Sequence, residues 1–184
     1  MTGARETTVL GGVPCLTPEG KRRLLRQTAT AHGLRVFVET GTHAGDTLAA
    51  MLAEPVIIDR AFSAELSGSH FERVAERFED EPRLELYHGD SARYVLELLP
   101  RLGAPALFWL DAHPGEPGTA GRYGESPLRE ELRAIFAAPR FDHVVLVDDV
   151  RLFTERGWPS VEEVRQIASG WNVAIEMDIA RINR

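Results

Sequence analysis

Cysteine is nearly absent from this sequence, in which Cys15 is the only one among 184 residues. A single cysteine forms neither an intramolecular disulfide framework nor a cysteine-based metal cluster. Long apolar runs are missing as well, since no stretch approaches the roughly 20 residues that cross a bilayer, and the N-terminus lacks the basic and then apolar segments of a secretory signal. These absences predict a reducing compartment, the cytoplasm by default, and no membrane partner.

Positive charge is also scarce. The chain has 21 Lys and Arg against 28 Asp and Glu, for a net charge of −7. Nucleic acids and anionic membranes both favour clustered basic side chains, so we expect neither as the main partner. The one short basic run, Lys21, Arg22 and Arg23, is interpreted as the solvated face of a helix. The length favours a single domain, and a hydrophobic fraction of 43% is typical of a globular protein with a real core.

Apolar and amphipathic segments alternate along the chain. Residues 1–16 are rich in Gly, Thr and Pro and are interpreted as a flexible N-terminal arm, while residues 17–184 form one predicted domain. Its first helix has Thr17 as the N-cap, Pro18 in the first turn and Gly33 at its end. Five strands are then predicted at 34–39, 61–66, 83–89, 105–111 and 142–149, with helices after them at 45–54, 69–80, 91–102, 126–138 and 160–170.

The C-terminal residues 171–184 alternate on both sides of Met177 and Asp178, which predicts a hairpin. Strands separated by helices form parallel sheets with right-handed crossovers. We therefore expect an α/β fold: a doubly wound, mostly parallel sheet with helices on both faces and a C-terminal antiparallel hairpin strand. One long loop, residues 112–126, is predicted to be functional or mobile.

The turn after the first predicted strand, ETGTHAG, contains an acid and two glycines. In an open α/β sheet, ligands bind at the carboxyl ends of the strands. Gly41 would let the backbone approach a ligand, Gly45 would let the next helix pack closely, and Glu39 is placed to hold a cation. A dinucleotide motif fits less well because His43 stands where the second glycine belongs, and a P-loop is excluded because no Gly-Lys-Ser/Thr follows.

Acids also stand at the ends of the next two strands. Glu65 follows the second strand, where a carboxylate can accept hydrogen bonds from both hydroxyls of a ribose. Asp90 lies in a Gly-Asp-Ser run after the third strand, where it can accept from an adenine amino group. Three acids at three successive strand ends indicate a site for one nucleoside.

This order of motifs resembles the class I S-adenosylmethionine-dependent methyltransferases, from about Arg35 to the C-terminus. The resemblance implies a Rossmann-like fold and S-adenosylmethionine as the cofactor. It places the methionine part at the first motif, the ribose at the second acid and the adenine at the third. The implied cofactor contacts are Glu39, Thr40, Gly41, Thr42, Gly45, Glu65, Leu66, Gly89, Asp90, Ser91 and Asp111.

Three further aspartates stand at the ends of the last two parallel strands. Asp111 follows the fourth, and Asp148 and Asp149 follow the fifth. Carboxylates this close raise one another's pKa unless a cation lies among them, and hard oxygen ligands suit Mg²⁺ or a similar ion. The layout looks like the small metal-dependent O-methyltransferases, including those that act on sugar hydroxyls. In that group the ion binds the substrate oxygen and lowers its pKa.

His113 stands two residues after Asp111. In the sugar-modifying group the motif is commonly Leu-Asp-Gly-Asp with the last aspartate as general base, and here it is Leu-Asp-Ala-His. Histidine is a competent base near neutral pH. We therefore predict His113 and Asp111 as the catalytic residues. The alternative for His113 is a loop histidine that contacts substrate or shapes the loop.

The leading hypothesis is methyl transfer from S-adenosylmethionine to oxygen of a small-molecule or sugar acceptor, with help from a divalent metal. The alternatives are methylation at nitrogen without a metal, another reaction of the same cofactor, and a non-catalytic nucleoside-binding module. A homodimer through the terminal hairpin edge or the N-terminal helix is a further expectation.

Overall fold

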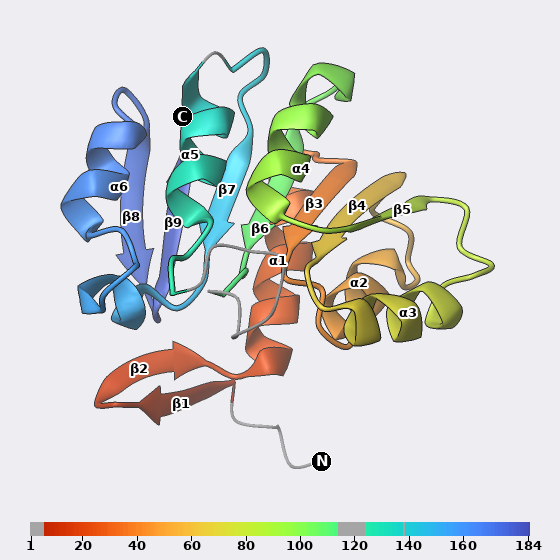
Figure 1. Cartoon of the computed structure of the whole chain (residues 1–184), viewed down its shortest axis with the longest axis horizontal. Helices are drawn as coiled ribbons and strands as arrows, with labels where there is room; N and C mark the ends of the chain where they lie inside the picture. Colours follow the sequence, from red (N-terminus) through yellow and green to blue (C-terminus); the bar gives the residue numbers. More distant parts are fainter. Residues whose placement is uncertain (1–5, 114–123, 138) are drawn as a thin grey trace.

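The computed structural model describes residues 6–113, 124–137 and 139–184. Its centre is a seven-stranded sheet in the order β5-β4-β3-β6-β7-β9-β8, which Figure 1 shows edge to edge. The parallel strands are β3 (Val36–Thr40), β4 (Arg60–Glu65), β5 (Leu84–His88), β6 (Ala106–Leu110) and β7 (Val144–Val147), and the antiparallel ones are β8 (Asn172–Glu176) and β9 (Ile179–Asn183). The predicted α/β fold with a C-terminal hairpin is confirmed.

The strand order reverses beside β3, the first parallel strand in the chain. The next two strands, β4 and β5, extend the sheet on one side of β3, and β6 and β7 extend it on the other. Such a switch point leaves a crevice at the carboxyl ends of the two central strands, which is where ligands bind in open α/β sheets.

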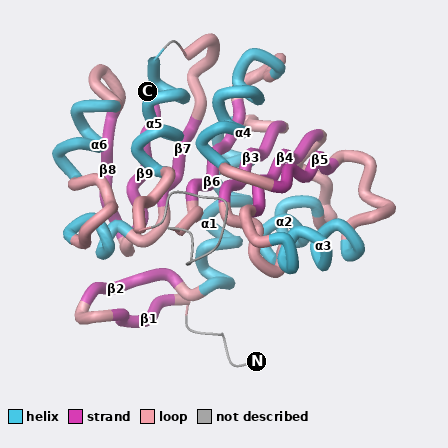
Figure 2. The backbone as a smooth tube through the Cα atoms, viewed as in Figure 1, coloured by secondary structure: helices cyan, strands magenta, loops and turns pink. Residues whose placement is uncertain are grey.

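Helices cover both faces of the sheet (Figure 2). The helices α1 (Pro18–His32), α2 (Asp46–Leu52) and α3 (Gly68–Arg77) pack on one face, and α4 (Ser91–Leu98), α5 (Leu128–Ala137) and α6 (Val161–Ile167) pack on the other. Two short 3-10 helices, Leu99–Arg101 and Val150–Thr154, complete the described segments. None of the described helices has the length and apolar character to cross a bilayer.

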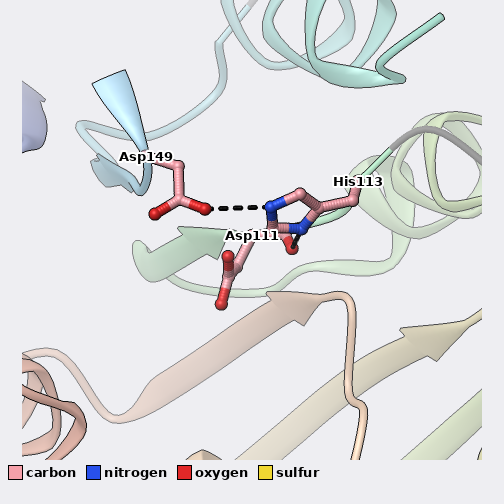
Figure 3. Close-up of side chains that lie close together, drawn as sticks. All are labelled: Asp111, His113 and Asp149. Atoms are coloured by element: carbon pink, nitrogen blue, oxygen red, sulfur yellow. Dashed lines mark hydrogen bonds and ion pairs between the residues drawn. The ribbon is translucent and has the colours of Figure 1, made fainter. Parts of the chain in front are cut away.

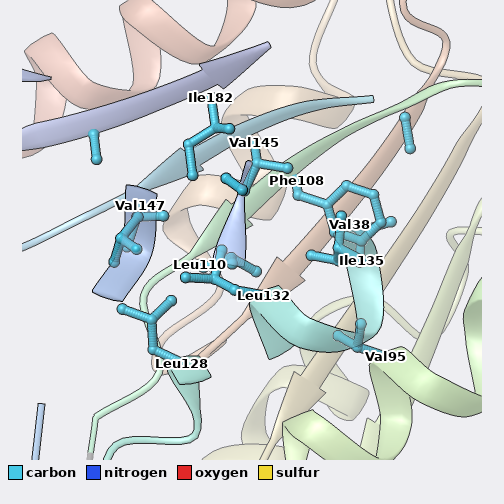
Figure 4. Packing of buried hydrophobic residues seen from close by; sticks show 14 of the residues in the cluster. Val38, Val95, Phe108, Leu110, Leu128, Leu132, Ile135, Val145, Val147 and Ile182 are labelled. Atoms are coloured by element: carbon cyan, nitrogen blue, oxygen red, sulfur yellow. The ribbon is translucent and has the colours of Figure 1, made fainter. Parts of the chain in front are cut away.

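Each face of the sheet has its own hydrophobic core because strand side chains alternate between the two faces. Phe37 on β3 belongs to the core under α1 and α2, whereas its neighbour Val38 belongs to the core under α4 and α5. Figure 4 shows the second core, in which Phe108, Val145 and Leu132 meet. Burial of one such side chain stabilises the fold by about 1.5–3 kcal/mol, so the central strands, packed on both faces, anchor the loops at their ends.

The first helix begins and ends as its sequence predicts. The side chain of Thr17 accepts a hydrogen bond from the backbone N–H of Gly20 at 3.2 Å, and Gly33 ends the helix in the left-handed conformation. At the far end of the chain, Ser160 and Glu163 form a reciprocal capping box on α6. These caps fix where the loops at the sheet edge begin.

Two strands lie within residues 1–16, for which the sequence predicted a flexible arm and no strand. Strands β1 (Thr7–Leu10) and β2 (Val13–Leu16) pair as an antiparallel hairpin apart from the main sheet (Figure 1). Gly11 and Gly12 form its turn at φ of 55° and 84°, a conformation that glycine adopts without strain. Residues 1–5 and most of the predicted loop, residues 114–123, lie outside the described part of the chain.

Candidate active site

Hydrogen bonds beyond the ends of the strands align the predicted residues on one edge of the sheet. The amides of Gly41 and Gly89 donate to carbonyls of neighbouring strands at 3.0 and 2.9 Å, and those of Asp111 and Asp148 do the same at 3.1 and 3.0 Å. Each bond extends the parallel ladder by one residue. The five acid-bearing strand ends therefore share one edge, as predicted.

The glycine turn lies at the switch point between β3 and β6. Gly41 has a φ of +83°, and a Cβ there would lie 2.6 Å from the backbone oxygen of Asp111, so only glycine fits between the two strand ends. Gly45 has a φ of +76°, and its Cβ would lie 2.8 Å from the ring of Phe78. Gly45 thus lets α2 approach the end of α3, a different packing reason from the one predicted.

Glu39 is buried beneath the glycine turn. Its side chain is 1% exposed, and its Oε2 accepts a 2.9 Å hydrogen bond from the hydroxyl of Ser63. The Ser63 hydroxyl lies 2.6 Å from that of Thr42, and burial raises the pKa of Glu39 well above its usual value. This chain of bonds fastens the glycine turn to β4, so Glu39 supports the turn from below, and its predicted role in holding a cation stays a prediction.

Two cavities, of about 570 and 820 Å³, open at this edge and share Gly41, Leu66, Ala112 and His113. The smaller lies toward α4 and α5, and the larger toward α1 and α3. The predicted cofactor residues that line them are Gly41, Thr42, Glu65, Leu66, Gly89, Asp90, Ser91 and Asp111. Glu39, Thr40 and Gly45 line neither.

Glu65 lies at the junction of the glycine turn and α3. Its Oε2 accepts from the backbone N–H of His43 at 2.7 Å, and its Oε1 accepts from the N–H of Ser67 at 2.8 Å. The carboxylate is 8% exposed and lines the larger cavity. Two backbone donors hold it in one orientation, which leaves its remaining lone pairs for hydroxyl donors from a ligand.

Asp90 caps α4 and also lines the smaller cavity. Its Oδ1 accepts from the backbone N–H of Arg93 at 2.9 Å, and Gly89 and Ser91 on either side line the same cavity. An N-cap position fixes the carboxylate at the cavity wall, so the capping role and the predicted contact with adenine are compatible.

The aspartates after β6 and β7 are not equivalent. Asp148 is 2% exposed, and its Oδ2 forms an ion pair with the ammonium of Lys21, while its Oδ1 accepts from the N–H of Asp149 at 2.9 Å. Lys21 is therefore not part of a solvated helix face, because α1 carries it into the carboxylate cluster. Asp148 lies outside the group of Asp111, His113 and Asp149, whose ligand atoms come within 4.8 Å of one another, so its predicted role as a metal ligand stays a prediction.

Asp149 has a partner on each oxygen too, and one of them is a histidine (Figure 3). Its Oδ1 accepts from Arg151 Nη1 at 2.6 Å, and its Oδ2 lies 2.9 Å from His113 Nε2. Burial alone would raise the pKa of Asp149, but the hydrogen bonds from His113 and Arg151 outweigh it and lower the pKa to about 2. Arg151 also pairs with Asp178, in the hairpin turn. Neither Lys21 nor Arg151 was among the predicted site residues.

His113 has an acceptor at each ring nitrogen. Nδ1 lies 3.1 Å from the backbone oxygen of Asp111, and Nε2 faces Asp149. The hydrogen bond to Asp149, supported by the nearby charge of Asp111, raises the pKa of His113. Both ring nitrogens therefore have a partner in this structure, and the role of His113 as a proton acceptor stays a prediction.

Among the described residues, the Asp111 carboxylate is the member of the cluster without a side-chain partner. Burial first, and then repulsion from Asp148 and Asp149, raise its pKa to about 7. Within the described residues no hydrogen bond reaches its side-chain oxygens, and one ligand atom each from Asp111, His113 and Asp149 lie within 4.8 Å of one another. Two carboxylates and one imidazole at this spacing fit a divalent cation.

A buried acid that the sequence did not single out lies behind the smaller cavity. Glu131 on α5 is 1% exposed, and its Oε1 accepts from the Ser91 hydroxyl at 2.6 Å. Its other oxygen and the buried Thr40 hydroxyl do not reach hydrogen-bonding geometry with any described group. Burial raises the pKa of Glu131 to about 7, although the Ser91 and Thr40 hydroxyls lower it in part.

Glu131→Gln should remove part of the pH dependence of stability. Because the pKa rises from 4.5 to about 7 on folding, the folded state binds the proton more tightly, and the wild-type protein loses stability as the pH rises through this window. The loss amounts to up to about 3 kcal/mol, and the glutamine variant should not show it. Urea unfolding at pH 5 and pH 8 measures the free energy of unfolding of both proteins at each pH. An equal change in that free energy between the two pH values in both proteins would contradict the assignment.

No family model and no curated protein matches this sequence. Solved structures do match in fold. An O-methyltransferase from Bacillus cereus, solved in complex with S-adenosylhomocysteine, aligns at a TM-score of 0.63 and 13% identity, over 92% of this chain and 82% of its own. The O-methyltransferase TomG from Streptomyces achromogenes, solved with S-adenosylmethionine, aligns at 0.60 and 18% identity, over 91% and 81%.

An N-methyltransferase, NodS from Bradyrhizobium japonicum, aligns at a TM-score of 0.57 and 13% identity, over 90% of this chain and 95% of its own. At these identities the likeness concerns the fold. The chain therefore shares the fold of these methyltransferases, which agrees with the Rossmann-like fold that the sequence motifs predicted.

Proposed function

We propose that this protein transfers a methyl group from S-adenosylmethionine to an oxygen of a small-molecule or sugar-type acceptor. The observation that carries the proposal is the meeting of three features at one switch point: the glycine turn at Gly41, the clamped carboxylate of Glu65, and the carboxylate cluster around Asp111. The fold is one in which S-adenosylmethionine and S-adenosylhomocysteine are bound by other proteins.

The donor would span both cavities. Its ribose hydroxyls would bind Glu65, whose two oxygens are already oriented by the amides of His43 and Ser67. Its adenine would lie in the smaller cavity near Asp90. The close approach at Gly41, which lines both cavities, would bring the reactive sulfonium toward Asp111. Methyl transfer from a sulfonium chiefly requires alignment of donor and acceptor, which this rigid edge supplies.

We assign a divalent ion to Asp111, His113 and Asp149 in place of the set predicted from the sequence, because ligand atoms of these three residues lie within 4.8 Å of one another. Ligation by His113 would replace its bond to Asp149. An imidazole ligand suits Mn²⁺, Fe²⁺ or Zn²⁺ at least as well as Mg²⁺. Such an ion lowers the pKa of an acceptor hydroxyl. The chain's own part is to hold the acceptor beside Asp111 and to keep the neighbouring charges balanced through Lys21 and Arg151.

A transfer assay with S-adenosylmethionine labelled in the methyl group tests this proposal. We expect label to reach hydroxyl-bearing small molecules or sugars when Mn²⁺ or Mg²⁺ is present, and the transfer to stop when the ion is chelated. Full activity in the chelator would contradict the ion and favour nitrogen as the acceptor. A protein that binds the cofactor but supports no transfer to any acceptor class would instead be a nucleoside-binding module.

A further inference from the structure

The larger cavity contains one arginine that the rest of the site does not use. Arg22 is half-buried on α1, one turn after Pro18, and both line this cavity. Residues four apart on a helix share a face. The described part of the chain offers Arg22 no hydrogen bond and no ion pair, although its neighbours Lys21 and Arg23 pair with Asp148 and Glu6.

The other charges of this cavity explain why an unpaired arginine matters. Three acids line it, Asp46, Glu65 and Asp111, and Arg22 is the only Arg or Lys among the described residues of its wall. An anionic group that entered would be repelled by the acids. A guanidinium offers donors in a fork that matches a carboxylate, and such charge-assisted pairs are the strong ones.

The cofactor of the proposed reaction brings such a group. S-adenosylmethionine ends in an amino acid, so a carboxylate enters the site together with the adenosine. With Glu65 on the ribose and Asp90 near the adenine, the amino-acid end falls in the larger cavity, which extends from Gly41 to α1. We propose that Arg22 binds the carboxylate of the cofactor's amino-acid end. This inference rests on the proposed function.

Two ligands that differ only in the amino-acid end test the contact of Arg22 separately from the contacts with the adenosine. S-adenosylhomocysteine has the amino-acid end, whereas 5′-methylthioadenosine keeps the adenosine and the thioether but lacks it. In the Arg22→Gln variant, calorimetry should show S-adenosylhomocysteine binding weakened by about 10- to 100-fold, with 5′-methylthioadenosine binding as in the wild-type protein. The Arg22→Lys variant keeps the positive charge but not the paired donors of the guanidinium, so its affinity for S-adenosylhomocysteine should fall less than that of Arg22→Gln.

Arg23→Gln is the matched control, because it removes the same charge from the next residue of the same helix, where Arg23 pairs with Glu6. It should bind both ligands as the wild-type protein does. If Arg22→Gln weakened the binding of both ligands equally, or of neither, the proposed role of Arg22 would be overturned. The proposed function would not be affected by that result. A wild-type protein that binds neither ligand would overturn the proposed function and this inference with it.

Discussion

Replacing Glu65 by glutamine should weaken the binding of S-adenosylhomocysteine by at least about 100-fold, because two charge-assisted hydrogen bonds to the ribose are lost at once. The amide also disturbs its own support. Both carboxylate oxygens accept from backbone N–H groups, of His43 and Ser67, and the amide nitrogen of glutamine cannot accept from either. The side chain would therefore lose its fixed orientation as well as its charge.

Isothermal calorimetry measures this loss directly. Glu72→Gln is the control. Glu72 is an exposed acid of the nearby helix α3, so this substitution removes the same charge without changing the lining of either cavity. Affinity close to that of the wild-type protein in Glu65→Gln would show that the ribose lies elsewhere, and would remove Glu65 from the site.

The second large effect concerns Asp148 and Asp149, two adjacent aspartates whose substitutions should affect Mn²⁺ binding differently. Asp149→Asn should weaken Mn²⁺ binding by at least about 100-fold, since even supporting residues around a metal ligand are worth about 10- to 100-fold, and methyl transfer should fall with it. Asp148→Asn should leave Mn²⁺ binding nearly intact. It should instead lower the melting temperature, because Lys21, whose side chain is only 22% exposed, loses the nearer of its two carboxylate partners.

Titration of each variant with Mn²⁺ alone, without an acceptor, gives the comparison. Both variants should still bind S-adenosylhomocysteine, because the cofactor is held by the ends of β3, β4 and β5. If Asp148→Asn abolished Mn²⁺ binding as completely as Asp149→Asn, the ion would instead use the ligand set that the sequence alone suggests.

Much of the site was predictable because strand ends are readable in a sequence. Apolar runs that stop at Glu65, Asp90, Asp111 and Asp148 each mark a carboxyl end, and parallel strands gather such ends on one edge. The same rule does not say which way each side chain points. Glu39 is two residues after Phe37 and shares its face of β3, and the register with β4 places Ser63 beside it, so the acid is buried under the turn.

The residues that sequence analysis missed depend on contacts between distant segments. Lys21 and Asp148 are 127 positions apart, and nothing in the helical pattern of α1 indicates that its first turns lie beside the end of β7. Glu131 lies within the predicted helix 126–138, and acids on helices are usually solvated. Only the packing of α5 against α4 reveals that this one is buried beside Ser91.

The N-terminal hairpin is a different case, because its signal was present in the sequence. A Gly-Gly pair between short β-branched and apolar stretches is a strong hairpin pattern. The richness of residues 1–16 in Gly, Thr and Pro obscured it, since the same composition is typical of loose segments. Gly11 and Gly12 supply the two positive φ values that such a tight hairpin turn requires.

The most direct test of this account is a crystal structure with S-adenosylhomocysteine and Mn²⁺. It should show adenine in the smaller cavity by Asp90, both ribose hydroxyls on Glu65, and the sulfur facing an ion held by Asp111, His113 and Asp149. A ligand bound away from the glycine turn, with Glu65 contacting only the amides of His43 and Ser67, would contradict it.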